Sequence, residues 1–250
     1  MKVLGSLLAL VFAAPVAAAK PAELLVFAGA ASKPVLDEAA VAIQKELGVA
    51  LVFSYGGSGT VLSQMELAKK GDLYIPGSHD WLERAVARGL VDPKTRVDFA
   101  YLRPALLVRA GNPKNIRTLA DLGRADVKAA IADPRTVCVG EYGEKLLANA
   151  GLSQILMPKL ARAHSCEAVA NLLATGTVDA VLGWEVFVAW FPGEVEEVPV
   201  PPQWIPGQAT IPGAVSVFSQ HPQEATAVLR WLAGPHGKAI WQKHGYRTSP

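Results

Sequence analysis

Apolar and polar residues alternate along the first part of the chain in a rhythm that predicts strands and helices in turn. Glu23–Ala28 is an apolar run of strand length, and Pro34–Leu47 has helical spacing with Pro in its first turn. The same order then repeats twice, with strands at Val49–Ser54 and Leu73–Ile75 and helices at Thr60–Lys70 and Asp80–Ala87. Three consecutive βα units predict a parallel sheet with helices on its faces.

The rhythm restarts after a longer apolar strand, which we expect at Tyr101–Arg109. The later elements are expected as strands Ala129–Asp133, Asp179–Trp184 and Ile211–Phe218, and as helices Tyr142–Ala150, Cys166–Ala174, Pro222–Trp231 and Lys238–His244. This predicts an α/β protein of two lobes, each a mixed or parallel sheet flanked by helices, joined by two crossing segments near 101–104 and 200–211. We assign 20–102 and 208–250 to lobe 1 and 103–207 to lobe 2.

The first 19 residues have the pattern of a secretory signal peptide. Met1-Lys2 is a short positive start, Val3–Val16 is an apolar run, and Ala17–Ala19 supplies the small residues of a cleavage site. We therefore expect an exported, periplasmic protein whose mature chain begins at Lys20.

Composition narrows the classes of partner. The chain has 250 residues, of which 18% are charged, and a formal net charge of +2. Because Lys and Arg form no run and do not alternate with aromatic residues, we expect no nucleic-acid partner. Cys138 and Cys166 are the two cysteines, and in an oxidising compartment an even count favours a disulfide between them.

The stretch "SYGGSGT", from Ser54 to Thr60, is the first candidate for chemistry. Its glycines let the backbone approach a ligand closely, and the hydroxyl of Ser58 lies where a helix begins. Such a loop is a neutral cradle for an anion, although Ser58 could instead cap the helix. Ser32, in the preceding βα loop, has the same two interpretations. Neither a Walker pattern nor a complete G-x-S-x-G motif is present.

Several segments, in order, resemble the periplasmic molybdate/tungstate-binding proteins of ABC transporters. They are "ELLVFAGAASKPVLDEAA", "VFSYGGSGTVLSQMELAKKGDLYIPGSHDWLERA", "ADPRTVCVGEYGEKLLANAG", "GTVDAVLGWEV" and the closing "LRWLAGPHGKAIWQKHGY". The resemblance covers nearly the whole mature chain. It implies a type II solute-binding fold that holds a tetrahedral oxyanion between two lobes with neutral donors.

Carried onto this sequence, the resemblance implies a set of ligand-contacting positions. They are Ala31, Ser32, Gly57, Ser58 and Gly59, the backbone N–H groups of Val139 and Cys166, the aromatic residue Trp184, and the neighbouring Glu185. The sequence departs from the family pattern in its displaced first serine, its glycine-rich serine loop and a tryptophan where a tyrosine is usual. We expect a binding protein that is not an enzyme, a monomer that delivers its ligand to a membrane permease, with no cofactor and no metal.

The ligand itself stays open among several classes. A fully ionised oxyanion has only acceptors and suits a site made of donors, whereas monoprotonated phosphate also needs an acceptor. Glu141 and Glu185 lie near the expected site, either as ligand contacts or as rim charges paired with Arg135 or Lys33. The alternatives are sulfate or phosphate, an organic carboxylate, a thiophilic oxyanion or metal held by Cys138 and Cys166, and a hydrolase using Ser58.

Overall fold

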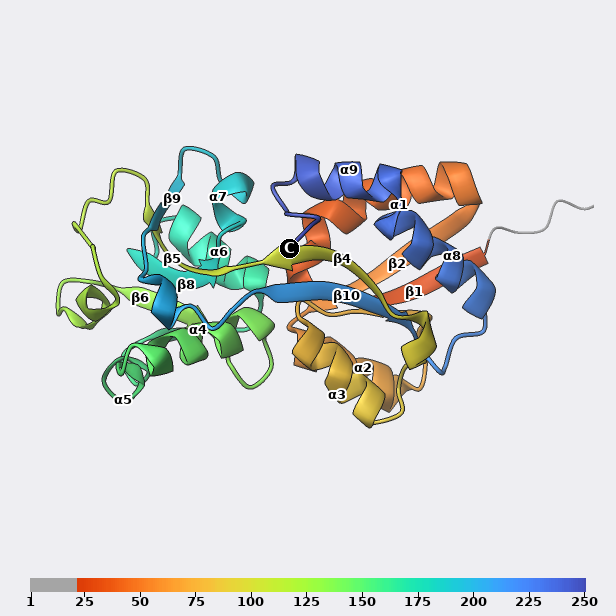
Figure 1. Cartoon of the computed structure of the whole chain (residues 1–250), viewed down its shortest axis with the longest axis horizontal. Coiled ribbons are helices and arrows are strands. Elements are labelled where there is room, and N and C mark those ends of the chain that lie inside the picture. Colours follow the sequence, from red (N-terminus) through yellow and green to blue (C-terminus); the bar gives the residue numbers. More distant parts are fainter. Residues whose placement is uncertain (1–21) are drawn as a thin grey trace, which may run out of the picture.

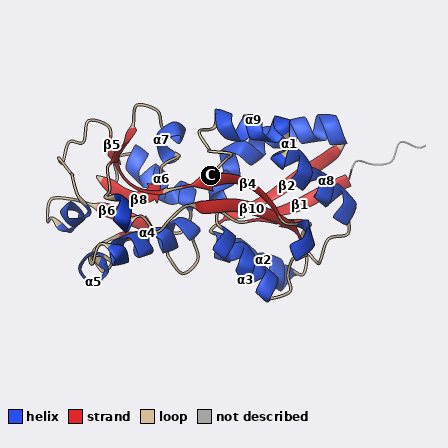
Figure 2. Ribbon diagram, viewed as in Figure 1, coloured by secondary structure: helices blue, strands red, loops and turns tan. Residues whose placement is uncertain are grey.

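The computed structural model describes residues 22–250, whose strands and helices are grouped around two separate sheets (Figure 1). The expected signal peptide lies outside the described residues. Helices cover both faces of each sheet, and the two halves lie side by side along the long axis (Figure 2). We call lobe 1 the half that contains the first strand and lobe 2 the other half. The predicted α/β class with two mixed sheets is confirmed.

The sheet of lobe 1 places three strand ends at one edge. Its strands are β1 (Ala22–Gly29), β2 (Val49–Gly56), β3 (Leu73–Ile75), β4 (Val97–Leu102) and β10 (Ala209–Val215), in the order β2-β1-β3-β10-β4. Strand β1 is parallel to β2 and β3, and β10 is antiparallel to β3 and β4. Because parallel strands end at the same edge, the loops after β1, β2 and β3 open on one side of the sheet.

The helices of lobe 1 bury apolar faces against this sheet. They are α1 (Lys33–Leu47), α2 (Ser58–Ala68), α3 (His79–Ala87), α8 (Pro222–Ala233) and α9 (Pro235–Lys243), with short 3-10 turns η1 (Ala30–Ser32) and η2 (Pro93–Thr95). Helices α1 and α9 lie on one side of the sheet, and α2 and α3 lie on the other (Figure 1). Leu36, Leu62 and Leu82 are fully buried on their inward faces, and this apolar burial is the main force that holds the layers together.

The sheet of lobe 2 has the same mixed plan. Its strands are β5 (Pro104–Arg109), β6 (Ala129–Ala132), β7 (Ala161–Ala163), β8 (Ala180–Trp184) and β9 (Val195–Val198), in the order β7-β6-β8-β5-β9. Strand β6 is parallel to β7 and β8, whereas β5 is antiparallel to β8 and β9. Its helices are α4 (Cys138–Asn149), α5 (Ser153–Leu156), α6 (Cys166–Ala174) and α7 (Phe187–Trp190), with 3-10 turns η3 (Leu119–Gly123) and η4 (Pro202–Trp204).

The chain passes from lobe 1 to lobe 2 at Arg103. The single strand expected at Tyr101–Arg109 is wrong, because β4 ends at Leu102 and β5 begins at Pro104 in the other sheet. Pro104 has no N–H and restricts the residue before it, which favours a break at this point. The Arg103 guanidinium makes two hydrogen bonds of 2.8 Å to the Glu197 carboxylate. The return crossing is the segment 199–208, between β9 and β10.

The C-terminal residues end at the junction of the lobes (Figure 1). The Arg247 carbonyl accepts a 2.8 Å hydrogen bond from the N–H of Tyr101 in β4. The Arg247 guanidinium lies 3.5 Å from the Glu185 carboxylate of lobe 2. The last residues therefore contact both halves of the molecule.

One apolar cluster runs through both lobes. It joins β1 and β3 of lobe 1 to Cys138, Cys166 and Trp184 of lobe 2, and a smaller cluster around Leu106 and Leu146 fills the rest of lobe 2. Trp184 and Trp241 are the largest fully buried side chains. Among residues 22–250, each helix is too short or too polar to cross a lipid bilayer.

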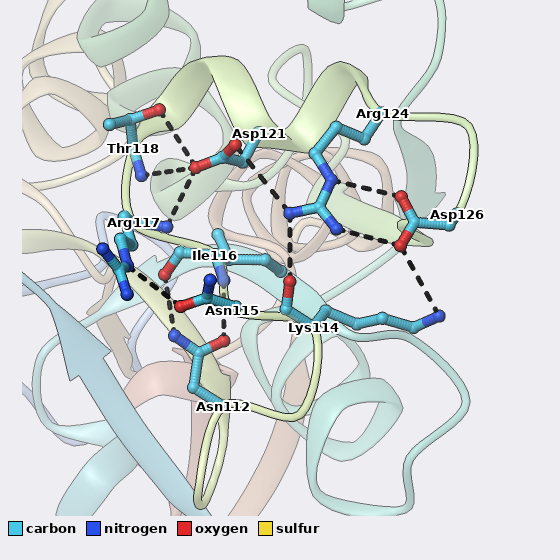
Figure 3. Close-up of polar contacts among 9 residues, drawn as sticks. All are labelled: Asn112, Lys114, Asn115, Ile116, Arg117, Thr118, Asp121, Arg124 and Asp126. Carbon is cyan, nitrogen blue, oxygen red and sulfur yellow. Dashed lines mark hydrogen bonds and ion pairs between the residues drawn. The ribbon is translucent and has the colours of Figure 1, made fainter.

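The connection between β5 and β6 is fixed by polar contacts (Figure 3). The Asp121 carboxylate accepts from the N–H groups of Arg117 and Thr118, each at 2.9 Å, and these bonds lower the pKa of Asp121. The Arg124 guanidinium donates to the Asp126 carboxylate at 2.9 Å and to the Lys114 carbonyl at 3.0 Å. These bonds satisfy charged groups and turns at the end of lobe 2 that lies away from the junction.

Candidate functional site between the lobes

Three loops of lobe 1 bring small polar residues to the junction. Strand β1 leads through η1 to Ser32, β2 leads to Ser58 at the start of α2, and β3 leads to Ser78 just before α3. All three hydroxyls come from residues that are at most 1% exposed. Because the loops leave the same edge of a parallel sheet, they lie against one another, and Gly77 of the third loop meets Cys138 of lobe 2.

The helix-capping interpretation fails for both predicted serines. Ser32 stands at the N-cap of α1 but makes no capping hydrogen bond, and its Oγ finds no partner among residues 22–250. Helix α2 starts at Ser58 itself, with Gly57 at the N-cap. Ser58 Oγ accepts a 3.0 Å hydrogen bond from the N–H of Gly77, and its own O–H is a donor that lies beside Cys138 of lobe 2.

Two glycines allow the lobes to approach closely. A Cβ on Gly57 would lie 2.7 Å from the Thr136 carbonyl oxygen, and a Cβ on Gly77 would lie 2.6 Å from the Cys138 sulfur. Both distances are shorter than real Cβ contacts allow. Beside them, the N–H of Gly59 donates to the Thr136 carbonyl at 2.8 Å, a hydrogen bond between the lobes. The glycine-rich loop is therefore shaped by contact with lobe 2.

Lobe 2 presents two helix starts to these loops. Helix α4 begins at Cys138, so Val139 lies in its first turn rather than in a turn before a later helix, which corrects the predicted start at Tyr142. Helix α6 begins at Cys166, with Ser165 at its N-cap accepting from Ala168 N at 3.0 Å. First-turn N–H groups have no intrahelical partner, and the helix dipole makes these ends attractive to anions.

The two cysteines meet between the helix starts as thiols. Both are free and buried in the part of the chain that the structure describes, so the expected disulfide is wrong. The Cys166 thiol donates a hydrogen bond to Cys138, which is the main reason that the pKa of Cys138 is lowered, and the Ser58 hydroxyl adds to this effect. The same bond, together with burial, raises the pKa of Cys166 well above its ordinary value.

Aromatic side chains close the other sides of the site. Trp184, at the end of β8, is fully buried, and its indole Nε1 has no hydrogen-bond partner within the described residues. Its ring packs against Tyr142, with centroids 5.2 Å apart. The Tyr246 hydroxyl donates to the carbonyl of Ala31, which fixes the first loop from the C-terminal side.

The two acidic candidates bind protein groups. Glu185 accepts from the N–H of Arg103 and faces Arg247, so its carboxylate is directed at the crossing segment, and burial raises its pKa. Glu141 Oε1 lies 2.8 Å from Arg84 of lobe 1 and 3.5 Å from Lys145. The expected partners are wrong, because Arg135 pairs with Asp133 and Lys33 with Asp37.

A cavity of about 400 Å³ opens on one side of the junction, between α1 of lobe 1 and α6 and α7 of lobe 2. Its polar lining comprises Lys33, Asp37, Glu167, Asn171, Trp190 and His244. Ala30 of η1 also lines it, so the cavity lies beside the first serine loop.

The structure thus brings Gly57, Ser58 and Gly59 of lobe 1 against lobe 2, where Val139, Cys166 and Trp184 lie near Cys138. Ala31 lies beside Gly77, Ser32 is buried in the adjoining loop, and Glu185 is turned toward the crossing segment. That these positions bind a ligand stays a prediction. Sequence reasoning missed Ser78, Gly77 and Tyr142. The segment "IPGSHD" carried a signal for the first two, because it is the third loop at the same strand edge. Tyr142 had no such signal, since its role depends on contacts between the lobes.

The sequence profile of the family described as bacterial extracellular solute-binding protein matches residues 24–247. The chain belongs to this family. Among the relatives of this solute-binding protein, the molybdate-binding protein ModA of Escherichia coli K12 is 27% identical over 248 residues, which cover 92% of this chain and 91% of ModA.

Solved structures of similar proteins confirm the fold of this solute-binding protein as type II. The periplasmic molybdate-binding protein of Azotobacter vinelandii has a TM-score of 0.77 and 20% identity, and the match covers 91% of this chain and all of that one (100%). The sulfate-binding protein SubI of Mycobacterium tuberculosis has a TM-score of 0.76 and 22% identity, with 91% and 87% covered. The resemblance to ModA-like solute-binding proteins of ABC transporters is therefore confirmed.

Proposed function

We propose that this solute-binding protein captures a tetrahedral oxyanion such as molybdate or tungstate in the periplasm and delivers it to a membrane ABC transporter. It acts by binding and release, without catalysing a reaction. The lobes close on the anion, and the loops of Ser32, Ser58 and Ser78 face the starts of α4 and α6 around it.

One observation carries this proposal: three buried donors, two in the loops of lobe 1 that face lobe 2 and one at the end of β8 in lobe 2, lack a hydrogen-bond acceptor within residues 22–250. Ser32 Oγ, Ser78 Oγ and Trp184 Nε1 are buried and find no hydrogen-bond partner anywhere in residues 22–250. A buried donor without an acceptor costs about 1–3 kcal/mol, so such a group calls for a ligand or a solvent molecule that accepts. A fully ionised oxyanion, which has only acceptors, matches this set.

The neutrality of the donors suits a dianion in a closed site. Helix starts and hydroxyls supply partial positive charge without the desolvation cost of a buried Lys or Arg. Of the two nearby carboxylates, Glu185 is paired with Arg247, and Glu141 is paired with Arg84 through Oε1, while its buried Oε2 has no hydrogen-bond partner among residues 22–250. The two arginines limit the repulsion that these carboxylates exert on an anion. The molybdate-binding relatives support molybdate as the first ligand to test, and the sulfate-binding neighbour makes sulfate the second.

The test is calorimetric titration of the mature protein with molybdate, tungstate, sulfate and phosphate, followed by titration of Ser58→Ala. Losing a hydrogen bond to a charged ligand costs about 1.5–3 kcal/mol, so we expect Ser58→Ala to weaken binding of the preferred oxyanion by about 10-fold to 100-fold. Ser54→Ala is the matched control, because its hydroxyl donates to Gln64 at 3.0 Å outside the site.

The proposal is supported if the parent protein and Ser54→Ala bind molybdate or tungstate and Ser58→Ala does so much more weakly. Equal affinity in the parent and Ser58→Ala would remove the serine loop from the site. Absence of binding to all four anions would refute the ligand class.

A further inference from the structure

The two buried thiols bring chemistry that an oxyanion cradle does not need. Oxygen acceptors are best matched by O–H and N–H donors, whereas S–H is a weak donor. Cys138 and Cys166 are 1% and 2% exposed, and each opens a helix, a position that favours a thiolate. Of the two, Cys138 has the lowered pKa, while the pKa of Cys166 is raised. Both belong to the apolar cluster that spans the lobes, but polar groups also reach them: the Ser58 hydroxyl and the Val139 N–H contact Cys138, and the Val139 N–H and the Trp184 indole contact Cys166.

The two thiols lie beside each other in lobe 2, at the starts of α4 and α6. They are joined by a hydrogen bond, and the Trp184 indole N–H approaches Cys166. That indole nitrogen is fully buried and lacks a hydrogen-bond partner in the described chain, 22–250, so it is a donor aimed at the thiol pair. From lobe 1, the Gly77 backbone packs directly on the Cys138 sulfur.

We propose that Cys138 and Cys166 form a dithiol site for a trivalent, thiophilic oxyacid, with arsenous acid as its simplest probe. The proposal rests on the proposed function only in placing the ligand between the lobes. The step is As(OH)₃ + 2 RSH → (RS)₂AsOH + 2 H₂O. Two As–O bonds break and two As–S bonds form, each leaving hydroxide takes one thiol proton as water, and arsenic stays trivalent.

The surroundings suit this ligand better than a metal cation. Zinc and similar ions require three or four protein ligands, and residues 22–250 hold no cluster of three His, Cys, Asp or Glu side chains that could supply them. The trivalent oxyacid needs two sulfurs and keeps one hydroxyl, whose oxygen can accept from the Trp184 indole N–H. The lowered pKa of Cys138 supplies the thiolate that attacks first.

The experiment titrates sodium arsenite, by calorimetry, into the reduced mature protein and into Cys138→Ser and Cys166→Ser, with molybdate titrated into the same samples. Native mass spectrometry counts bound arsenic. We expect one arsenic per chain in the parent protein. Since a two-point attachment loses its chelate advantage when one thiol is removed, each variant should bind arsenite at least about 100-fold more weakly.

The serine variants keep a small hydroxyl donor in place of each thiol, so their loss of molybdate affinity should be smaller than their loss of arsenite affinity. Circular dichroism checks that they fold, and Cys166→Ala replaces Cys166→Ser if the latter does not. Equal arsenite affinity in the parent and both variants overturns the dithiol site. If the protein binds molybdate but forms no arsenic adduct, the dithiol site is overturned and the proposed function stands. If it forms the adduct but binds no molybdate, the dithiol site is supported and molybdate is refuted as the ligand.

Discussion

Cys138 sets the charge at the centre of the proposed site. A neutral thiol tolerates a dianion, but a thiolate repels it. Because the pKa of Cys138 is lowered by its hydrogen bond from Cys166, the thiolate forms at a pH below the ordinary value of 9.0. Glu141 and Tyr142 also face the Cys138–Cys166 pair.

Molybdate affinity should therefore fall as the pH rises through the pKa of Cys138. If the thiolate form excludes the dianion, Kd increases by about tenfold per pH unit above that pKa, because only the protonated fraction is competent to bind. Calorimetry from about pH 6 to about pH 9 measures this slope. Cys138→Ser, which has no group titrating there, should flatten it, and an equally steep slope in that variant would assign the titration to another group.

Gly77 governs how closely the lobes approach. A Cβ at this position would meet the Cys138 sulfur at 2.6 Å, across the junction. Overpacking costs about 1–3 kcal/mol, so Gly77→Ala should weaken ligand binding by about tenfold while the melting temperature of the unliganded protein changes little. Gly56→Ala is the control, because its Cβ would meet only Val61 of the same lobe, at 3.2 Å. Equal loss in both variants would point to a general effect on folding.

At the residue scale, sequence reasoning located side chains that sit in local motifs. The glycines around Ser58 and the position of Ser32 follow from strand–loop–helix patterns that can be recognised without neighbours. The state of Cys138 could not be predicted, because the compartment favoured a disulfide while the actual partners, Cys166 and Ser58, come together only in three dimensions. Ser78 was recoverable from its loop but carried no distinctive motif.

Helices α3 and α4 link the lobes on the side opposite to the cavity. The Tyr142 hydroxyl of α4 donates to the Asp80 carboxylate of α3 at 2.9 Å, and burial, followed by this bond, raises the pKa of Tyr142. Arg84 of α3 pairs with Glu141 of α4 at 2.8 Å. Because Arg84 is 44% exposed, its pair contributes about 1 kcal/mol at most.

Tyr142→Phe should make the closed state less stable without weakening either lobe. Removing one hydrogen bond of this kind costs about 1 kcal/mol, so we expect about fivefold weaker binding, expressed mainly as faster ligand release. Stopped-flow measurement of the release rate checks this. A changed association rate with unchanged release would argue that Tyr142 acts before closure rather than after it.

At the element scale, the βα order of lobe 1 could be predicted because each strand is a short apolar run, followed by a segment whose apolar residues have helical spacing. Strand β9 could not, since "VEEV" lacks the alternation of apolar and polar residues that marks a strand, and its pairing partner, β5, is distant in sequence. The division of the Tyr101–Arg109 segment was also missed: both β4 and β5 are apolar, and only Pro104 marks the change of sheet.

The two lobes together imply a protein that becomes more compact and more stable when it binds. A ligand at 100 times its Kd adds about 2.7 kcal/mol, which corresponds to roughly 5–10 °C in the melting temperature of a chain of this size. Differential scanning calorimetry with molybdate measures the shift, and small-angle scattering measures the radius of gyration. A melting temperature raised equally by chloride would show a general salt effect instead.

The whole-molecule plan could be predicted from order alone, because two βα runs separated by extended segments leave few ways to connect two sheets. The identity of the anion could not be predicted, because it depends on how far Trp184, Cys138 and Cys166 fill the space between the lobes. Those distances arise from packing across the junction, which the pattern of apolar and polar residues does not encode.

The position of the last residues has a practical consequence. Since Arg247 hydrogen-bonds to Tyr101 of one lobe and faces Glu185 of the other, a dye attached at the chain end would sense the relative motion of the two halves directly. The same position makes the C-terminus a poor place for an affinity tag, because the tag would lie next to the segment that joins the two lobes.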